Sequence, residues 1–386
     1  MSENNNAKQI IKFSGNKGEW SEIYVFLKLL VDGKLYATDR KMNRLPNTYL
    51  DVKKIIREEH KGVVLDYIPG SNIQITKNGS LIKPIIPKTE YQAIMRLIWE
   101  YISTSSVGAI QIPDADVFLD KIHITALKSP ATQTAGFFGG TTDITMEVSD
   151  YRSGINSTVG FSCKSDLGHK ATLINASGST NFIFKLKGPI TDELMICFNN
   201  IFDNKGHASI NDRINFLKEN KIEPFFEKTA SPSANRNLIL SGGKEMPEIV
   251  GALLKFFYWE RNGKKSNSTI RDALNYIVRN DVANYKLPDL ETIYEKKLGS
   301  FLYDAFTGLR FGSNWDGRPS VNGGYIVVKN SGEIVAYHST FTEQFKDFLL
   351  DNLAFESPST SRHGYMTIYK ENGEYLIKFN LQVRFR

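Results

Sequence analysis

The stretch "DITMEVSDYRSGINSTVGFSCK", residues 143–164, alternates apolar and polar residues on both sides of a polar centre. A period of two is typical of β-strands that bury one face. The central residues Asp150, Ser153, Gly154 and Asn156 favour a reversal of the chain. The stretch therefore predicts two neighbouring strands joined by a turn. The apolar rows comprise Ile144, Met146 and Val148 in the first strand and Val159, Phe161 and Cys163 in the second.

The polar rows of these two strands are expected to share the face opposite the core. Burial fixes the parity of the register, because a slip by one residue would turn every apolar side chain outward. A turn centred between Ser153 and Gly154 predicts Asp143 opposite Lys164 and Thr145 opposite Ser162. Opposed side chains lie about 5 Å apart. An acid and a lysine are therefore expected to meet on a polar surface beside a hydroxyl.

An acid on one strand, followed by acid-x-lysine on the next, resembles the active-site pattern of the PD-(D/E)xK nucleases. Here the pattern is Asp143 and then Ser162-x-Lys164. Phosphodiester hydrolysis needs a hard cation on the phosphate, and Mg²⁺ takes oxygen ligands from one or two carboxylates. A lysine suits the positioning of the attacking water. A plain exposed hairpin is the alternative, since acid and lysine at this spacing are common on solvated strands.

Composition bounds the class of protein. The 386 residues suffice for two domains, and 41% hydrophobic residues fit a packed globular chain. A net charge of +6 allows a polyanionic partner. Cys163 and Cys197 form neither a disulfide framework nor a zinc ligand set. Without a signal peptide or a long apolar run, we expect a cytoplasmic protein with no membrane association. P-loop, HExxH and GxSxG motifs are absent from the sequence, which argues against translocases, zinc hydrolases and serine hydrolases.

The segment "GNKGEWSEIYVFLKLL", residues 15–30, predicts an amphipathic helix. Glu19 and Glu22 fall near its first turn, where the helix dipole favours negative charge, and this is the alternative to a role at a metal. The order Lys17-Gly18-x-x-x-Glu22 resembles the first-helix motif of several PD-(D/E)xK nucleases, which favours Glu22 over Glu19. The buried stripe predicted for this helix is Trp20, Ile23, Leu27 and Leu30.

Periodicity and turn residues also predict the domain organisation. A polar segment, "KTASPSANRN", predicts a linker over 228–240. It would separate a catalytic core at 10–227 from a C-terminal α+β domain at 241–386, with a flexible N-terminus at 1–9. The patterns predict helices over 89–103, 114–121, 191–201, 208–217, 247–260, 268–278 and 292–306, a strand over 121–127, and hairpins that turn at Asn78-Gly79, Ser331-Gly332 and Asn372-Gly373.

Polar loops supply candidate DNA contacts. Uncharged hydrogen-bonding side chains bind phosphates or base edges, and arginine and asparagine read guanine and adenine bidentately. Ordinary turns have a similar composition, which is the alternative. The candidates are Asn175, Ser177, Thr180 and Asn181 in the first loop, Arg310, Asn314, Arg318 and Asn322 in the second, and Arg362 in the third.

Several stretches together resemble the HpaII-type family of type II restriction endonucleases. The resemblance implies a Mg²⁺-dependent nuclease of the PD-(D/E)xK fold that cuts both strands of double-stranded DNA at a short palindrome. It also implies a cognate DNA methyltransferase and, because palindromes match two-fold symmetry, favours a homodimer. The namesake of the family cuts CCGG, which makes CCGG a candidate site. The stretches are "GNKGEWSEIYVFLKLL", "DITMEVSDYRSG", "GFSCKSDLG", "TLINASGSTNF", "GGYIVVKNSGEIVAYH", "STSRHGYMTIYKENG" and "IKFNLQVRF", in order from residue 15 to 385.

The predicted fold is α/β, a PD-(D/E)xK core with a mixed β-sheet flanked by helices. Asp143, the main-chain carbonyl of Cys163 and Glu22 are the predicted ligands of Mg²⁺. Lys164 orients or activates the water, and Ser162, which replaces the usual second acid, lines the site. Glu147 and Asp150 are further candidate acids, and Asp150 is the alternative to Asp143 as metal ligand. The alternative functions are a non-cleaving sequence-specific DNA-binding protein and a structure-selective repair nuclease.

Overall fold

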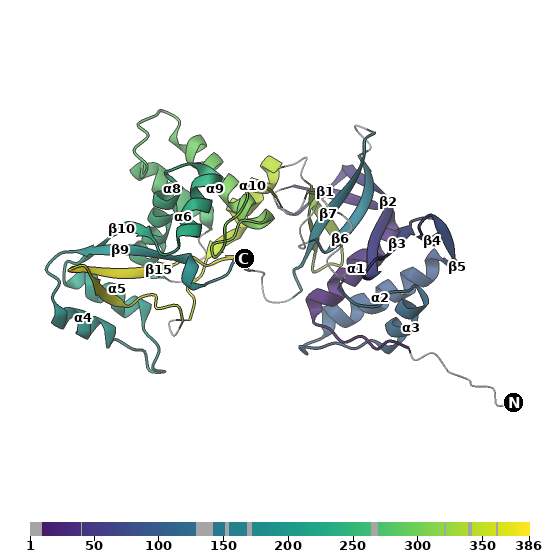
Figure 1. Cartoon of the computed structure of the whole chain (residues 1–386), viewed down its shortest axis with the longest axis horizontal. Helices are drawn as coiled ribbons and strands as arrows, with labels where there is room; N and C mark the ends of the chain where they lie inside the picture. Colours follow the sequence, from purple (N-terminus) through teal and green to yellow (C-terminus); the bar gives the residue numbers. More distant parts are fainter. Residues whose placement is uncertain are drawn as a thin grey trace. The chain divides into compact units, whose positions relative to one another are not determined.

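A computed structural model describes residues 10–39, 41–128, 142–150, 154–167, 172–263, 269–319, 322–338, 342–359 and 362–386. The chain divides into two compact units, which are Met1–His169 with Ser320–Gln344 and Lys170–Pro319 with Phe345–Arg386 (Figure 1). The prediction of a flexible N-terminus at 1–9 lies outside the described residues. Both units combine helices with β-sheets, so the α/β class is confirmed.

The first unit is built on a nine-stranded sheet of order β1-β12-β11-β7-β6-β2-β3-β4-β5. β1 also pairs with the long strand β2, so the pairings from β1 through β12, β11, β7 and β6 to β2 close on themselves. The elements are α1 (Lys17–Asp32), β1 (Lys34–Thr38), β2 (Arg44–His60), β3 (Val63–Ile68), β4 (Asn72–Lys77), β5 (Ser80–Pro87), α2 (Lys88–Thr104), α3 (Pro113–Lys121), β6 (Ile144–Asp150), β7 (Asn156–Ser165), β11 (Gly324–Val328) and β12 (Ile334–His338).

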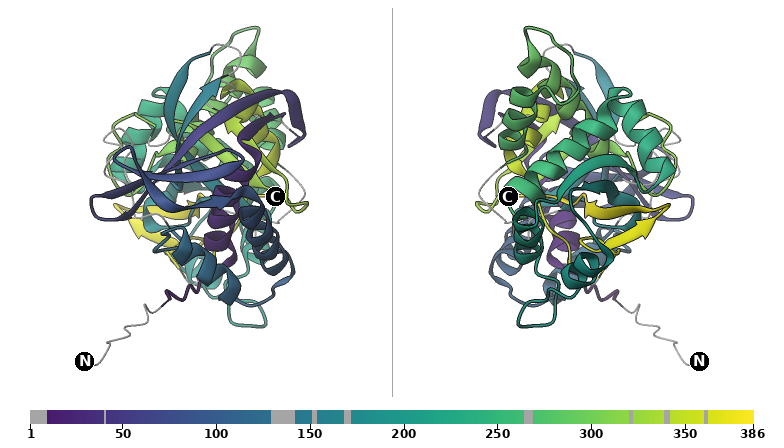
Figure 2. Two further views of the ribbon diagram at one scale, coloured as in Figure 1. Left: turned by 90° about the vertical axis from the view of Figure 1, so that its right-hand side faces the viewer. Right: turned by 90° about the vertical axis from the view of Figure 1, so that its left-hand side faces the viewer.

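Helix α1 carries the central core of this unit. It begins with a capping box between Asn16 and Glu19 and ends at Gly33, whose φ of 66° is left-handed. Its predicted stripe is buried, and the apolar rows of β6 and β7 belong to the same hydrophobic cluster. The left view of Figure 2 faces this unit and shows its helices beside one another beneath the strands.

The β6–β7 hairpin confirms the predicted alternation but not the predicted register. Ile144 pairs with Phe161 and Met146 with Val159. Asp143 therefore falls opposite Ser162, and Lys164 lies two residues further along the same face. A slip by two residues leaves every apolar side chain on the core, so burial cannot distinguish the two registers.

The second unit contains a four-stranded sheet of order β10-β9-β15-β14 and a three-stranded sheet of order β13-β16-β8. Figure 1 shows α6, α8 and α9 on one side of β9, β10 and β15, and α4 and α5 on the other. The elements are β8 (Thr172–Ile174), η1 (Gly178–Thr180), β9 (Asn181–Lys187), α4 (Asp192–Asn199), α5 (Ile210–Glu219), β10 (Glu223–Thr229), α6 (Pro232–Gly242), α7 (Met246–Lys255), η2 (Phe256–Glu260), α8 (Ile270–Asn280), α9 (Leu290–Thr307), α10 (Thr342–Asn352), which begins at the unit boundary, β13 (Leu353–Phe355), β14 (Ile368–Glu371), β15 (Glu374–Asn380) and β16 (Val383–Phe385).

All the predicted helices and hairpins are present, whereas the predicted linker is wrong. Residues 228–240 complete β10 and form most of α6. The hydroxyl of Ser231 caps that helix by accepting from the Ala234 N–H, and Pro232 occupies its first turn. The sequence that resembles a linker is therefore a helix start.

The predicted domain boundary near residue 228 also differs from the compact units, which meet at His169 and Lys170. Residues 320–344 return to the first unit because β11 pairs in parallel with β7 and β12 with β1. Pairing across more than 150 residues leaves no local signal in the sequence.

The strand predicted over residues 121–127 is not formed. His123 has a left-handed φ of 65°, and the residues after it bond to side chains of β2. Thr125 donates its N–H to the Glu59 carboxylate at 2.7 Å, and the Leu127 carbonyl accepts from Arg57 at 3.3 Å. Charged side chains thus take the place of a partner strand.

Candidate active site and DNA-contact loops

Asp143 lies just before β6, and its carboxylate is held by β7. Oδ2 of Asp143 accepts a hydrogen bond from Ser162 Oγ at 2.9 Å and from the Cys163 main-chain N–H at 2.6 Å. The Asp143 N–H donates to the Phe161 carbonyl at 3.0 Å. The carboxylate is therefore fixed at the end of the hairpin.

Glu22, on α1, belongs to the same cluster of charges. Burial first, and the negative charge of Asp143 second, raise the pKa of Glu22 to about 7. Lys128, Arg57 and Lys164 act in the opposite direction. The helix thus brings a second acid within electrostatic reach of Asp143, and like charge and burial both disfavour its ionisation.

Lys164 and Cys163 point to opposite faces of β7. Lys164 shares the polar face with Ser162, and its charge acts on both Glu22 and Cys163. The Cys163 thiol belongs to the core, where burial raises its pKa well above the usual value, as do the charges of Asp143 and Glu22. Cys163 therefore meets the site through its main chain.

The structure separates the other candidate acids from this cluster. Glu19 accepts the Asn16 N–H at 2.8 Å in the helix cap, so its carboxylate has a local structural role. Glu147 lies 3.6 Å from Lys54. Asp150 ends β6, and seven residues of strand place it about 23 Å from Asp143.

Two residues near the cluster give no signal in the sequence. The Arg57 guanidinium pairs with Glu59 at 2.7 Å, and both side chains are almost fully buried. Tyr325, on β11, pairs with Ser162, and burial raises the pKa of its hydroxyl well above the usual value, with Cys163 and Asp143 as the next causes. Arg57 lies in a charged stretch of sequence, which is also typical of exposed positions. Tyr325 lies in an apolar stretch, which is also typical of the core. The sequence therefore does not mark either residue as a neighbour of the site.

The candidate DNA contacts divide into exposed and buried residues. Thr180 and Asn181 are buried and hydrogen-bonded within the second unit, which makes them unable to reach DNA, contrary to the prediction. Ser177 is partly buried and caps η1. The exposed candidates are Asn175, Arg310, Asn314, Arg318 and Arg362.

Asn322 belongs to the first unit, whereas Arg310, Asn314 and Arg318 of the same predicted loop belong to the second. Its Oδ1 accepts from the Gly160 N–H at 2.8 Å and its Nδ2 donates to the Thr158 carbonyl at 3.3 Å. Asn322 therefore acts as a partner of the β7 backbone, and its prediction as a DNA reader is not supported by this placement.

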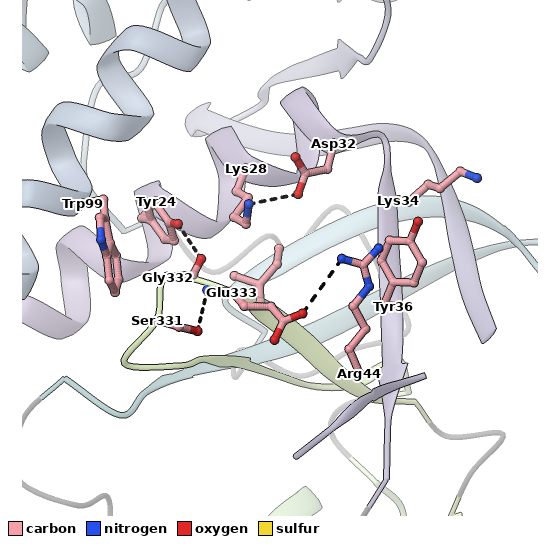
Figure 3. A pocket seen from close by; sticks show the side chains of 11 residues that line it. Tyr24, Lys28, Asp32, Lys34, Tyr36, Arg44, Trp99, Ser331, Gly332 and Glu333 are labelled. Atoms are coloured by element: carbon pink, nitrogen blue, oxygen red, sulfur yellow. Dashed lines mark hydrogen bonds and ion pairs between the residues drawn. The ribbon is translucent and has the colours of Figure 1, made fainter. Parts of the chain in front are cut away.

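A separate cavity of about 420 Å³ lies between α1, α2 and the β11–β12 turn (Figure 3). Lys28 pairs with Asp32 at 3.1 Å, and Arg44 stacks on Tyr36. These side chains satisfy one another, and neither Asp143 nor Lys164 lines the cavity. We assign it no role in the chemistry.

Within the described ranges, no group of three or more His, Cys, Asp or Glu side chains is arranged to hold a metal ion. The two candidate carboxyl groups within electrostatic reach of each other are Asp143 and Glu22. None of the helices in the described part of the chain is long and apolar enough to cross a membrane.

The candidate site thus joins an acid, a hydroxyl and a lysine on or beside adjoining strands, with a second acid from the first helix. The model of the HpaII restriction endonuclease family matches residues 16–385. The type II restriction enzyme HpaII of Haemophilus parainfluenzae is 36% identical over 378 residues, which cover 97% of this chain and 99% of that enzyme. No solved structure gives a significant match.

The chain therefore belongs to the HpaII restriction endonuclease family. It is a type II restriction endonuclease, an enzyme that cuts DNA at a specific sequence. Enzymes of this type generally use divalent metal ions.

Proposed function

We propose that this restriction endonuclease is Mg²⁺-dependent and that its first unit is a PD-(D/E)xK catalytic core acting through Asp143, Glu22 and Lys164. The observation that supports this most directly is the fixed Asp143 carboxylate, joined to β7 by two hydrogen bonds and placed with Glu22 and Lys164 in one charge cluster. Mg²⁺ is commonly bound by one or two carboxylates together with substrate phosphates, so two acids suffice.

The residues present suit such an ion. Within the described residues both hydrogen bonds to Asp143 go to Oδ2, so we assign Oδ1 to the cation. The Cys163 carbonyl points to the same strand edge as its N–H, which faces Asp143. With Glu22 these oxygens form the proposed ligand set, and Ser162 orients Asp143 instead of adding charge.

Bound there, Mg²⁺ would neutralise the scissile phosphate and favour deprotonation of water. Lys164 donates a hydrogen bond to the attacking water or to a phosphate oxygen, since an ammonium group offers three donors and a positive charge. The closed strand pairing holds Asp143, Ser162 and Lys164 on adjoining positions, so little reorganisation is needed when DNA binds.

We further propose that recognition of a short palindrome, with CCGG as first candidate, depends on the exposed arginines and asparagines of the second unit. A palindrome favours a homodimer, and a cognate methyltransferase would protect host DNA. Glu22, Asp143 and Lys164 belong to no recognition loop, so their roles can be tested separately from DNA reading.

The test is plasmid digestion with Mg²⁺ or EDTA by the wild type, Lys164→Ala and a control, Lys53→Ala, which removes an exposed lysine of β2. We expect discrete fragments only with Mg²⁺, and a loss of cleavage rate of about a thousandfold or more for Lys164→Ala with DNA binding retained. Cleavage in EDTA, or by Lys164→Ala at the control rate, would exclude the assignment. Retardation of DNA without any cutting would favour the non-cleaving binder.

A further inference from the structure

A buried asparagine fixes the loop that follows α9. Asn237, on α6, is 0% exposed. Its Nδ2 donates to the carbonyls of Arg310 at 2.6 Å and Ser313 at 2.8 Å. Its Oδ1 accepts from the Trp315 N–H at 3.1 Å and from Arg236 Nη1 at 3.0 Å. One amide thus uses its full hydrogen-bonding capacity, mostly on the main chain of a single loop.

A second pair of buried amides joins two further loops. Asn181 and Asn380 face each other across β9 and β15. Nδ2 of Asn380 donates to Oδ1 of Asn181 at 2.7 Å and to the Ser177 carbonyl at 2.8 Å. Nδ2 of Asn181 donates to the His363 carbonyl at 2.8 Å. The pair therefore ties the 175–181 turn to residues 362–366.

Arg213 anchors the other end of residues 362–366. Its buried guanidinium donates to the carbonyls of Asn199 at 2.6 Å and Ile201 at 3.1 Å, and also to that of Met366. In the described parts of the chain no carboxylate pairs with it. Its hydrogen bonds therefore serve to hold three stretches of main chain together.

The segment 362–366 needs such support because it is strained. His363 and Met366 have left-handed φ values of 62° and 58°, and Gly364 lies between them at 62°. A non-glycine residue in this region of backbone conformation is strained and persists only where its surroundings fix it. Strain held by buried hydrogen bonds is typical of segments that must present side chains in one shape.

The side chains that these anchors present are exposed and basic. Arg310, Arg318, Arg362 and His363 all lie at the surface. A Cβ added at Gly312 would lie 3.4 Å from Ser179 Oγ, so the loop after α9 meets the 175–181 turn. The three loops are therefore contiguous through Ser179 and Asn181.

We propose that these loops form one preset reading surface for the base edges of double-stranded DNA, with Arg362 and His363 as specificity-determining residues and Asn237, Asn181 and Arg213 as positioning residues. The proposal rests on the proposed function. Guanidinium groups read guanine edges bidentately, and a bidentate contact discriminates only if it is held in place. Fixing the loops beforehand also reduces the ordering cost of binding.

The test is selection from a random duplex DNA library in metal-free buffer, followed by sequencing of the bound DNA. The parent is Lys164→Ala, which should bind without cutting. We expect the parent to enrich one motif. Arg362→Ala and His363→Ala should each lose about tenfold discrimination at one base position. Asn237→Ala and Asn181→Ala should lower enrichment of the whole motif by about tenfold or more while salt-dependent binding to random DNA persists.

Two controls separate positioning from stability. Leu274→Ala truncates a buried side chain of α8 and lowers stability, and it removes none of the hydrogen bonds that hold the loops. Arg279→Ala removes an exposed arginine of the same unit. Both should keep the parent motif. The proposal is overturned if Asn237→Ala and Asn181→Ala enrich the motif as well as Leu274→Ala does, or if Arg362→Ala and His363→Ala leave it unchanged. If Asn237→Ala does not fold, the surface variants decide.

The outcomes also distinguish this inference from the proposed chemistry. A wild type that cuts with Mg²⁺ while the loop variants keep full discrimination leaves the catalytic assignment standing and removes the reading surface. The opposite outcome is that the Lys164→Ala parent enriches a motif that depends on the loops while the wild type cuts in EDTA. In that case the reading surface stands and the catalytic assignment is removed.

Discussion

Ser162 donates its hydroxyl to Oδ2 of Asp143 at 2.9 Å, at the strand position where the general nuclease pattern has a second acid. The serine thus orients one carboxylate instead of contributing another. Because the Cys163 N–H donates to the same oxygen, Asp143 is held from two adjacent residues of β7. A second carboxyl group, Glu22 on α1, lies within the electrostatic reach of Asp143 and is the proposed replacement for the acid missing at position 162.

Replacing Ser162 with aspartate should create a site that depends on a cation for stability. In EDTA the new carboxylate would face Asp143 across the strand pair, and like charges in such positions are destabilising. We expect Ser162→Asp to melt below Ser162→Ala in EDTA, and Mg²⁺ to raise its Tm more than that of Ser162→Ala. Thermal unfolding with and without Mg²⁺ measures this. Equal Mg²⁺ effects on both variants would place the cation elsewhere.

Asp143→Ala and Asp150→Ala should differ sharply in cleavage. Asp143 belongs to the charge cluster, so its loss should reduce single-turnover cleavage by at least about a thousandfold, the order expected for loss of a group that stabilises the transition state. Asp150 lies at the far end of β6, so Asp150→Ala should change the cleavage rate by no more than a few-fold. Quantified digestion of one labelled duplex measures both rates. A large loss for Asp150→Ala alone would reverse the choice of ligand.

Glu22→Gln should stabilise the metal-free protein at alkaline pH. The folded-state pKa of about 7 exceeds the usual 4.5, so the folded form binds the proton more tightly and the free energy of unfolding falls as pH rises from about 4.5 to 7. Because glutamine does not ionise, Glu22→Gln removes this pH-dependent loss of stability. We expect a gain of up to about 3 kcal/mol at pH 8 and little gain at pH 4.

Urea unfolding in EDTA at both pH values measures the effect of Glu22→Gln. Glu100→Gln, at an exposed position of α2, is the control and should change stability equally little at either pH. A pH-independent effect of Glu22→Gln would contradict the prediction.

Gly324→Ala should destabilise the closed strand pairing. Gly324 has a φ of 116°, and a Cβ there would lie 2.0 Å from the Tyr337 carbonyl oxygen. Gly62→Ala is the matched control, because Gly62 also has a positive φ, 78°, but no neighbour within 4 Å. We expect Gly62→Ala to lower the free energy of unfolding by about 1 kcal/mol, because of backbone strain. Gly324→Ala should lower the free energy of unfolding by at least about 3 kcal/mol. Equal urea midpoints for the two variants would show that β11 accommodates the added Cβ at position 324 and would contradict the prediction.

The local elements of this protein can be predicted from its amino-acid sequence. The alternation of residues 143–164 predicts both strands and the face that each side chain occupies, and the stripe of residues 15–30 predicts α1. The turns at Asn78-Gly79 and Asn372-Gly373 predict their hairpins. These signals depend on a period or a dihedral angle within a few residues, which the sequence contains. The resemblance to the family was also evident from short stretches in order.

Features that depend on partners far away in the sequence emerge only in the folded chain. It set Asp143 opposite Ser162 instead of Lys164, because registers that differ by two residues bury the same side chains. It returned β11 and β12 to the first unit through pairing with β7 and β1. It also turned Asn181 from a predicted DNA contact into a buried anchor. A side chain's hydrogen-bond partner is a property of the folded chain, and composition alone does not reveal it.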